Sequence, residues 1–199
     1  MGALLVTSLN KDAGRTAFCA GLARLTARGQ GLPLLCKPIR ITSGNTSRIG
    51  DADVAFYAEI SGLPQAESWP GSMSVKEAQQ GLTASERKGV VDTFNQIAAS
   101  SKAVIVEAPP LANPQGLAFP IAAELAEVLD AKIVALVKYQ PDLNIEKGIR
   151  HLKALGDRLL GVVINFVPRY RRHTVESSLI PVLKEHGIKV LGNVPEVRC

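Results

Sequence analysis

Short apolar segments alternate along the chain with longer stretches that have the spacing of helices. The apolar segments predict strands, and they span Leu4–Thr7, Leu32–Cys36, Ala103–Val106, Lys132–Val137, Gly161–Asn165 and Lys189–Leu191. They are continuously apolar rather than alternating, which is typical of strands buried on both faces of a parallel sheet. The repeated order of strand and helix therefore predicts an α/β fold, with a doubly wound, mostly parallel sheet and helices on both faces.

Local signals place several of the helices and loops. The sequence Thr-Ala-Ser-Glu at Thr83–Glu86 matches a capping box and predicts a helix that runs to about Ser100. Two further helices are expected over residues 16–29 and 117–129, the latter with Pro120 in its first turn. Residues 41–51 and 64–74 are polar, contain Gly or Pro, and are predicted to form long loops. Loops of that length in a compact domain are often functional.

Size and charge narrow the classes of function. The 199 residues, of which 46% are hydrophobic, are enough for one domain with a full core, and we expect residues 1–199 to form that single domain. The net charge of +5 is spread along the chain, apart from a cluster at Arg169, Arg171 and Arg172. Aromatic residues make up only 5%, which argues against a nucleic-acid-binding surface. The excess of positive charge is compatible with a solvated surface and with a small anionic ligand such as a nucleotide.

The cysteines and the apolar runs bear on the compartment. Cys19, Cys36 and Cys199 are far apart and lack CxxC spacing, so the sequence suggests neither a disulfide framework nor a zinc site. The first apolar run stops at Ser8 without a basic region before it, so it is interpreted as a strand and not a signal peptide. No run approaches the ~20 residues that span a bilayer. We expect a cytoplasmic protein without a membrane contact.

The turn after the first predicted strand carries the strongest chemical signal. It reads Ser8-Leu9-Asn10-Lys11-Asp12-Ala13-Gly14-Arg15-Thr16 and leads directly into a predicted helix. A phosphate loop of the form GxxxxGK[ST] needs glycines so that backbone N–H groups can wrap the phosphates, a Lys for the β and γ oxygens, and a hydroxyl for Mg²⁺. Gly14 and Thr16 fit this pattern, and the helix start adds its own N–H groups. Arg15 stands in place of the Lys and Leu9 in place of the first Gly, so an ordinary strand-to-helix turn is the alternative.

The loop resembles that of dethiobiotin synthetase, a P-loop NTPase family, whose first glycine lies one residue further upstream, at the position of Ser8. Further similar segments follow in the order of that family, and together they cover nearly the whole chain: Cys36-Lys37-Pro38, Gly50–Ala55, Val104–Ala108, Gly161–Asn165 and Leu191–Glu196. All of them lie at predicted strand ends or in loops, where ligands of open α/β sheets bind.

The resemblance implies ATP and Mg²⁺ as ligands and assigns roles to residues. The nucleotide would be held by Ser8, Asn10, Lys11, Asp12, Ala13, Gly14, Arg15 and Thr16, with Asn165 at the adenine ring and Pro195 in the base-binding loop. The metal would be held by Thr16, Glu107 and one of Asp51 or Asp53. The catalytic cations would be Lys11, Arg15 and Lys37, with Lys37 at the γ-phosphate or at an acceptor. A homodimer is also implied.

Each of these residues also has a plain structural interpretation. Lys37 is a candidate for a solvated strand end, and Asn165 for a turn former. Asp51 or Asp53 is a candidate N-cap for a helix over residues 54–60. Glu107 directly after an apolar run is unusual, which favours a functional role.

Two departures from the family leave two functions open. A guanidinium at position 15 is planar and bulkier than the lysine ammonium it replaces. Ala108-Pro109-Pro110 replaces a Gly-rich segment and removes two N–H donors. One hypothesis is an ATP-dependent ligase that activates a carboxylate or carbamate. The other is a non-catalytic nucleotide-sensing module that acts on a partner protein, similar to the dethiobiotin synthetase-like N-terminal domain of some phosphotransacetylases, which the end of the chain soon after Pro195 also favours. A degenerate fold that binds no nucleotide is a third hypothesis.

Overall fold

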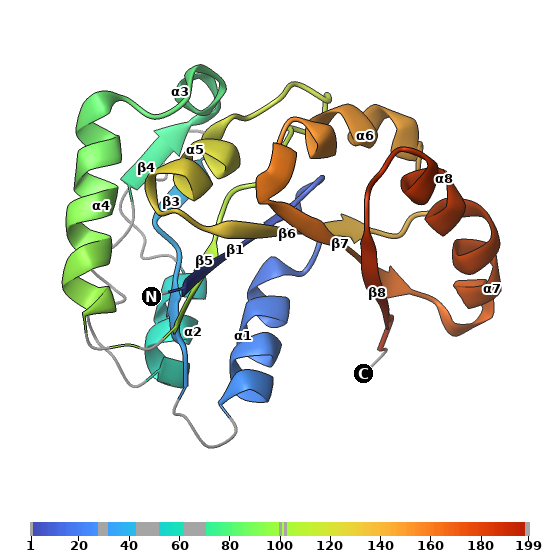
Figure 1. Cartoon of the computed structure of the whole chain (residues 1–199), viewed down its shortest axis with the longest axis horizontal. Coiled ribbons are helices and arrows are strands. Elements are labelled where there is room, and N and C mark those ends of the chain that lie inside the picture. Colours follow the sequence, from blue (N-terminus) through green and yellow to red (C-terminus); the bar gives the residue numbers. More distant parts are fainter. Residues whose placement is uncertain are drawn as a thin grey trace.

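The computed structural model describes residues 2–27, 32–42, 52–61, 71–99, 101 and 103–197 (Figure 1). Its main sheet has six strands, and every neighbouring pair within it is parallel. In spatial order the strands are β2 (Leu34–Cys36), β5 (Ala103–Glu107), β1 (Gly2–Ser8), β6 (Lys132–Lys138), β7 (Leu159–Val167) and β8 (Val190–Pro195). The predicted parallel α/β fold is confirmed.

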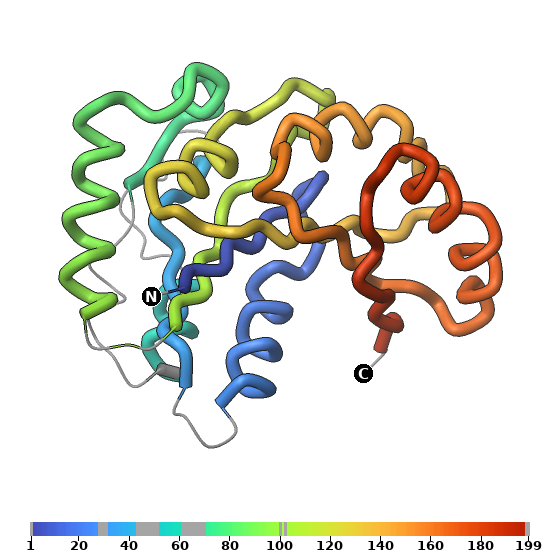
Figure 2. Tube along the Cα trace, in the orientation of Figure 1, coloured from blue at the N-terminus to red at the C-terminus, as the bar shows by residue number. Residues whose placement is uncertain are grey.

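The strand order places β1 in the middle of the sheet, between β5 and β6. The chain trace in Figure 2 shows β1 running through the centre of the molecule, and β8 is the edge strand of the sheet. The chain crosses from one side of β1 to the other between β5 and β6, so the loop that follows β1 lies at a switch point of the sheet. The residues that end β1, β5 and β2 therefore meet at one edge.

Helices cover both faces of this sheet (Figure 1). On one face, α1 (Arg15–Thr26) and α2 (Ala52–Ser61) pack on a buried cluster that includes Val6, Leu35 and Ile105. The helices on the opposite face contribute to a larger buried cluster, and they are α4 (Ala84–Ala98), α5 (Ile121–Val128), α6 (Ile145–Lys153) and α8 (Ile180–Glu185). Short turns complete the chain: η2 (Gly156–Arg158), η3 (Arg169–Arg171), α7 (Arg172–Thr174) and η4 (Val175–Leu179).

A second, two-stranded parallel sheet lies in part of the sequence predicted to be loop. Strands β3 (Ile39–Thr42) and β4 (Gly71–Ser74) pair with each other, and α3 (Val75–Gln80) follows β4. The predicted loops were therefore wrong at residues 41–42 and 71–74, because pairing between distant strands stabilises segments that look like loops locally. Ile39 and Met73 are buried by this pairing. Residues 43–51 and 62–70 lie outside the described part of the chain.

Helix ends agree with the sequence at one place and differ at another. Thr83 and Glu86 form the predicted capping box at the start of α4. Helix α5 begins at Ile121 rather than at Leu117, with Pro120 at its N-cap position. The cause is that the Phe119 N–H donates to the Leu111 carbonyl, which holds the preceding residues in a loop closed by a bridge between Ala112 and Ala118. None of the helices in the described residues is long and apolar enough to cross a membrane.

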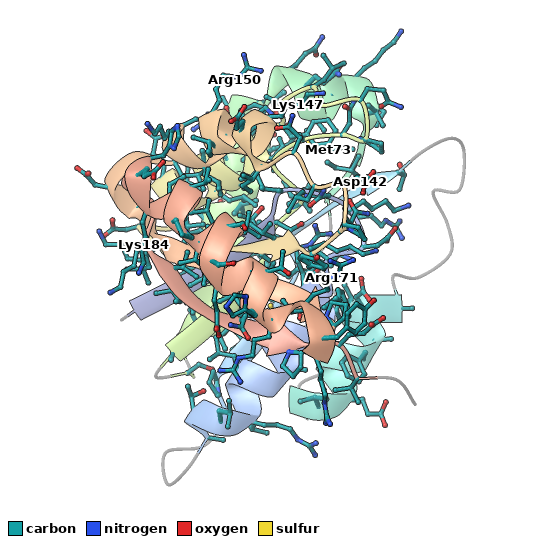
Figure 3. The ribbon with its side chains drawn as sticks, turned by 90° about the vertical axis from the view of Figure 1, so that its right-hand side faces the viewer. Met73, Asp142, Lys147, Arg150, Arg171 and Lys184 are labelled. Carbon is teal, nitrogen blue, oxygen red and sulfur yellow. The ribbon has the colours of Figure 1, made fainter. Side chains whose placement is uncertain are left out.

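Several basic side chains lie on the outer surface, away from the central strand ends. Figure 3 views the side that carries α6, α7 and α8, where the labelled Lys147, Arg150 and Lys184 project outward. All three side chains are exposed. These cations are a solvated surface, as the sequence indicated for the charge surplus.

Candidate nucleotide-binding site

The loop between β1 and α1 has the backbone shape of an anion-binding turn. Asp12 and Gly14 adopt left-handed conformations, with φ of 56° and 78°. No described residue accepts a hydrogen bond from the backbone N–H of Asp12 or Gly14, and α1 begins without a side-chain cap. These N–H groups are available to phosphate oxygens, and the helix dipole favours negative charge at the same place.

Leu9, the residue at the first glycine of the usual pattern, does not enter the loop. Its N–H donates to the Leu136 carbonyl at 2.9 Å, and its side chain is buried against Gly148 of α6. A Cβ on Gly148 would lie 2.5 Å from Leu9 Cδ1. Because the Leu9 side chain packs into the core beside Gly148, it does not occupy the space inside the loop between β1 and α1.

Arg15 lies across the loop and connects the ends of two strands. Its Nη1 donates to Ser8 Oγ at 2.6 Å, and its Nε lies 3.4 Å from Glu107 Oε1. The Ser8 hydroxyl in turn donates to the Asn10 carbonyl at 2.5 Å. The Arg15 side chain is only 14% exposed. The guanidinium is thus turned toward the strand ends and away from solvent.

Glu107 is the acid at the centre of the site. It is 1% exposed, and its Oε2 accepts hydrogen bonds from the Thr16 hydroxyl at 3.0 Å and the Tyr57 hydroxyl at 2.5 Å. Burial, and then the neighbouring Cys19 and Glu107, raise the pKa of Tyr57, so its hydroxyl stays protonated. Three donors from three positions in the chain therefore surround one buried carboxylate, as a buried charge requires.

Thr16 and Glu107 together supply oxygen ligands of the kind that Mg²⁺ prefers. The hydroxyl at the start of α1 and the carboxylate at the end of β5 are already adjacent. Mg²⁺ keeps several waters and is bound through one or two protein oxygens plus phosphates, so a small donor set suffices. Among the described residues there is no group of three His, Cys, Asp or Glu side chains that could hold a metal by itself. The donor set fits a metal that arrives with a nucleotide.

Lys37 and Asp53 form an ion pair next to this acid. Lys37 Nζ lies 2.5 Å from Asp53 Oδ2. Lys37 follows β2, and Asp53 stands in the first turn of α2, inside the helix and not at its N-cap. Asp51, the other candidate metal ligand, lies outside the described residues. The structure thus brings Arg15, Thr16, Lys37, Asp53 and Glu107 to neighbouring strand and helix ends.

Asn165 is close to the loop, but through a contact that the sequence did not indicate. Its Nδ2 donates to the Ala13 carbonyl at 2.8 Å, and its Oδ1 accepts the Phe166 N–H at 3.0 Å. Both ends of the amide are therefore engaged inside the protein, and recognition of adenine by Asn165 stays a prediction. Pro195 is exposed at the end of β8, beside the end of β7.

Two pockets flank the loop. The first, of about 390 Å³, is lined by four cationic side chains, two acidic ones and an apolar wall. Its cationic side chains are Lys11, Arg15, Lys37 and Arg40, and the apolar wall includes Ile39, Val75, Pro109 and Phe119. Such a mixture suits an anion with an apolar portion.

The second pocket, also of about 390 Å³, lies on the other side of Asp12 and is rich in aromatic side chains. Its lining includes Lys138, Tyr139, Phe166, Tyr170, Arg171 and Glu196. Phe166 has a left-handed backbone with φ 58°, and Lys138 Nζ lies 5.9 Å from the centre of its ring. These aromatic residues were not predicted from the sequence. Their position at or just beyond the carboxyl ends of β6 and β7 is the signal that would have found them.

A family comparison covers almost the whole chain. The model of the AAA_26 family, described as an AAA domain, matches residues 2–198. The chain belongs to this AAA domain family. The phosphate loop, the central strand β1 and the acid at the end of β5 are accordingly parts of a P-loop NTPase-like domain.

Solved structures share the fold of this AAA domain. A structure described as the MinC:MinD cell division protein complex from Aquifex aeolicus has a TM-score of 0.57 at 15% identity, covering 99% of this chain and 82% of that chain. A plasmid partition protein from Borrelia burgdorferi has a TM-score of 0.55 at 12% identity, covering 98% and 90%. A complex of a Cyanothece McdA variant with ATP has a TM-score of 0.54 at 14% identity, covering 99% and 84%. None of these three is a dethiobiotin synthetase, so the sequence resemblance holds at the level of the P-loop NTPase fold.

Proposed function

We propose that this AAA domain is a nucleotide-sensing regulatory module, which binds ATP with Mg²⁺ at the loop Ser8–Thr16 and signals the occupancy of that loop to a partner protein. The observation that carries the proposal is the position of Arg15 at the lysine site, held between Ser8 and Glu107. A guanidinium binds phosphate oxygens well, but its planar shape does not reproduce the ammonium that follows the γ-phosphate during transfer. The site is therefore suited to binding more than to catalysis.

The proposed binding exchanges one set of charge pairs for another. The N–H groups of Asp12 and Gly14 would receive the phosphates, and Arg15 would turn from Glu107 to a phosphate oxygen. Thr16 and Glu107 would hold the metal, which supplies positive charge between the phosphate oxygens. The change of Arg15 from one anionic partner to another gives the loop two states, which a sensor needs.

The segment after Glu107 supports the same proposal. Pro109 and Pro110 have no backbone N–H to offer a substrate. The Pro109 carbonyl is held by the Thr7 hydroxyl at 2.6 Å, in a buried contact. Two of the fold relatives are also compatible with a nucleotide-dependent module: one is a complex with ATP, and the other is a complex of MinC with MinD.

The test is isothermal titration of the protein with a non-hydrolysable ATP analogue and with GTP, each with and without Mg²⁺. We expect Mg²⁺-dependent binding that is weakened in Glu107→Gln, while Glu146→Gln, an exposed acid on α6, binds as the wild type does. Arg15→Lys should gain affinity but little turnover, whereas Arg24→Lys on the exposed side of α1 should change neither. Absence of heat with both nucleotides would overturn the proposal.

The ligase remains a second candidate, because the first pocket has the lining of an acceptor site. Its cations meet an apolar wall beside the phosphate loop. In that reaction a carboxylate or carbamate oxygen attacks the γ-phosphate and ADP leaves. An amine then attacks the activated carbonyl carbon, loses a proton and displaces phosphate, which forms an amide from the carboxylate or a urea from the carbamate. Lys37 would hold the acceptor anion. The observation in favour of this candidate would be release of ADP and phosphate by Arg15→Lys that depends on an added carboxylate.

A homodimer is proposed from the resemblance alone. Sedimentation velocity with and without the ATP analogue and Mg²⁺ measures it directly. A nucleotide-dependent shift from monomer to dimer would support a partner surface formed by a second copy of the chain.

A further inference from the structure

Helix α2 is fixed to the site at two points one turn apart. Asp53 and Tyr57 are separated by four residues, so they lie on the same face of the helix. Asp53 pairs with Lys37, which follows β2, and Tyr57 donates to Glu107 at the end of β5. Strands β2 and β5 are neighbours in the sheet. One face of α2 therefore spans two adjacent strand ends.

We infer that Tyr57 is a positioning residue. Through its hydrogen bond to Glu107, binding of a metal at that carboxylate sets the position of helix α2 and of Asp53 in the site. The metal-dependent role rests on the proposed nucleotide function, whereas the connection from Glu107 to α2 rests on the hydrogen bonds alone. Nothing in the phosphate-loop pattern requires a tyrosine at this place. The geometry alone assigns it.

Two helices meet at one oxygen atom of Glu107. The Thr16 hydroxyl from α1 and the Tyr57 hydroxyl from α2 both donate to Oε2. When the Thr16 oxygen turns a lone pair to a metal, or when the metal attracts Oε2 itself, the bond to Tyr57 must adjust, because the three groups share that oxygen. A change in the metal site is thereby transmitted to α2.

Tyr57 is held in a buried environment that fixes the position of its hydroxyl. It is 1% exposed and packs in the buried cluster with Leu35 and Ile105. The Cys19 thiol of α1 also lies against its hydroxyl. The hydroxyl is held as a donor to the carboxylate by this buried geometry. A hydrogen bond between a buried donor and a charged acceptor is among the stronger ones in a protein.

The alternative is that Tyr57 only fills the core, in which case phenylalanine would serve equally well. Tyr57→Phe keeps the ring in the cluster and removes only the hydroxyl. The readout is amide hydrogen exchange of residues 52–61, with α5 as the internal reference. Wild type, Tyr57→Phe, Glu107→Gln and the double variant are compared, first without nucleotide and then with the non-hydrolysable ATP analogue, with and without Mg²⁺.

Without nucleotide, we expect Tyr57→Phe and Glu107→Gln each to speed the exchange of α2 about tenfold, the size expected for loss of a hydrogen bond to a charged group. The double variant should be no faster than Tyr57→Phe, because both changes act on the same charge-assisted hydrogen bond: Tyr57→Phe deletes its donor, and Glu107→Gln removes the charge of its acceptor. Glu59→Gln, which alters an exposed side chain on the same helix, should leave the exchange unchanged. Unchanged exchange in Tyr57→Phe, or additive effects in the double variant, would overturn the inference.

With the analogue, Mg²⁺ should change the exchange rate of α2 in the wild type but not in Tyr57→Phe, even though the variant still binds the analogue. If Tyr57→Phe shows the same Mg²⁺-dependent change as the wild type, the inference is wrong. If the wild type binds no nucleotide at all, the proposed function fails instead, and the nucleotide-free comparison still decides whether Tyr57 connects Glu107 to α2.

Discussion

The side-chain amide of Asn165 donates a 2.8 Å hydrogen bond to the Ala13 carbonyl and so joins the end of β7 to the phosphate loop. The oxygen of the same amide accepts the N–H of Phe166, whose backbone is left-handed. Asn165 is 6% exposed. The loop proposed to receive the phosphates therefore rests on a buried polar side chain that is 152 residues away in sequence.

Asn165→Asp tests the importance of this contact. The substitution keeps the shape of the side chain, but it places a carboxylate oxygen opposite the Ala13 carbonyl in a buried site. We expect the free energy of unfolding to fall by about 2 kcal/mol, the cost of burying an unsatisfied polar group. Urea denaturation measures it. Asn144→Asp is the matched control, because Asn144 uses only its oxygen as an acceptor at the N-cap of α6, where Asp serves equally well. Equal losses in the two variants would contradict the assignment.

Gly14→Ala should distort the phosphate loop. Gly14 has φ 78°, and a Cβ there would lie 2.7 Å from Asn165 Nδ2 and 2.9 Å from the Phe166 ring. We expect loss of nucleotide affinity by at least about tenfold and a lower melting temperature, because both the backbone and the contact are strained.

Gly21→Ala on the same helix is the control for Gly14. A Cβ at Gly21 meets nothing within 4 Å, so alanine should stabilise α1 by roughly 0.5–1 kcal/mol and leave nucleotide binding unchanged. Titration calorimetry and thermal unfolding measure both variants. If Gly14→Ala binds nucleotide as the wild type does, the loop does not use this turn.

The parts of the structure that sequence predicted are those fixed by local patterns. Apolar runs predicted the six strands of the main sheet. Five of them are largely buried, as a strand covered on both faces requires, whereas β8 at the edge of the sheet is mostly exposed. The capping box at Thr83 predicted the start of α4, because both of its hydrogen bonds lie within four residues. The candidate phosphate loop and Glu107 were selected from a local pattern as well, since each directly follows an apolar run. Their roles in nucleotide and metal binding stay predictions.

The features that sequence did not predict depend on contacts between distant segments. Strands β3 and β4 are short, and each acquires its partner only from the other. Tyr57 is an ordinary helical residue in the sequence, and only the packing of α2 on β2 brings it to Glu107. Asn165 was selected as a base-contacting residue, whereas the fold supplies the Ala13 carbonyl as its acceptor.

Thr83→Ala should lower the free energy of unfolding by about 1 kcal/mol. The Thr83 side chain accepts the Glu86 N–H, and the Glu86 carboxylate accepts the Thr83 N–H at 2.8 Å, so alanine removes half of a reciprocal cap. Ser85→Ala, an exposed position in the first turn of the same helix, is the control and should change stability by no more than a few tenths of a kcal/mol. Chemical denaturation of the two variants compares them. A loss at Ser85 as large as that at Thr83 would show that the cap is not the cause.

The protein should lose stability in alkaline solution because two cysteine thiols and one tyrosine hydroxyl are buried in its core. Burial raises the pKa of the Cys36 thiol from 9.0 to about 12, and it also raises the pKa of Cys19 and of Tyr57. A folded pKa above the unfolded value means that the unfolded chain releases the proton first. The contribution is therefore complete below pH 9 and is lost as the pH rises toward 12.

Cys36→Ala separates one of these groups from the others. At pH 7 the variant shows only the packing cost of the missing sulfur, which does not depend on pH. The extra loss of the wild type relative to the variant should be about 0.7 kcal/mol per pH unit at pH 9, where the unfolded thiol is half ionised, and should steepen toward about 1.4 kcal/mol per pH unit above pH 10, the value for one group that ionises only on unfolding. Urea denaturation at a series of pH values measures both slopes. Parallel slopes for the two proteins would contradict this prediction. They would mean that the Cys36 thiolate forms as readily in the folded protein as in the unfolded chain, although Cys36 is buried in β2 next to β5.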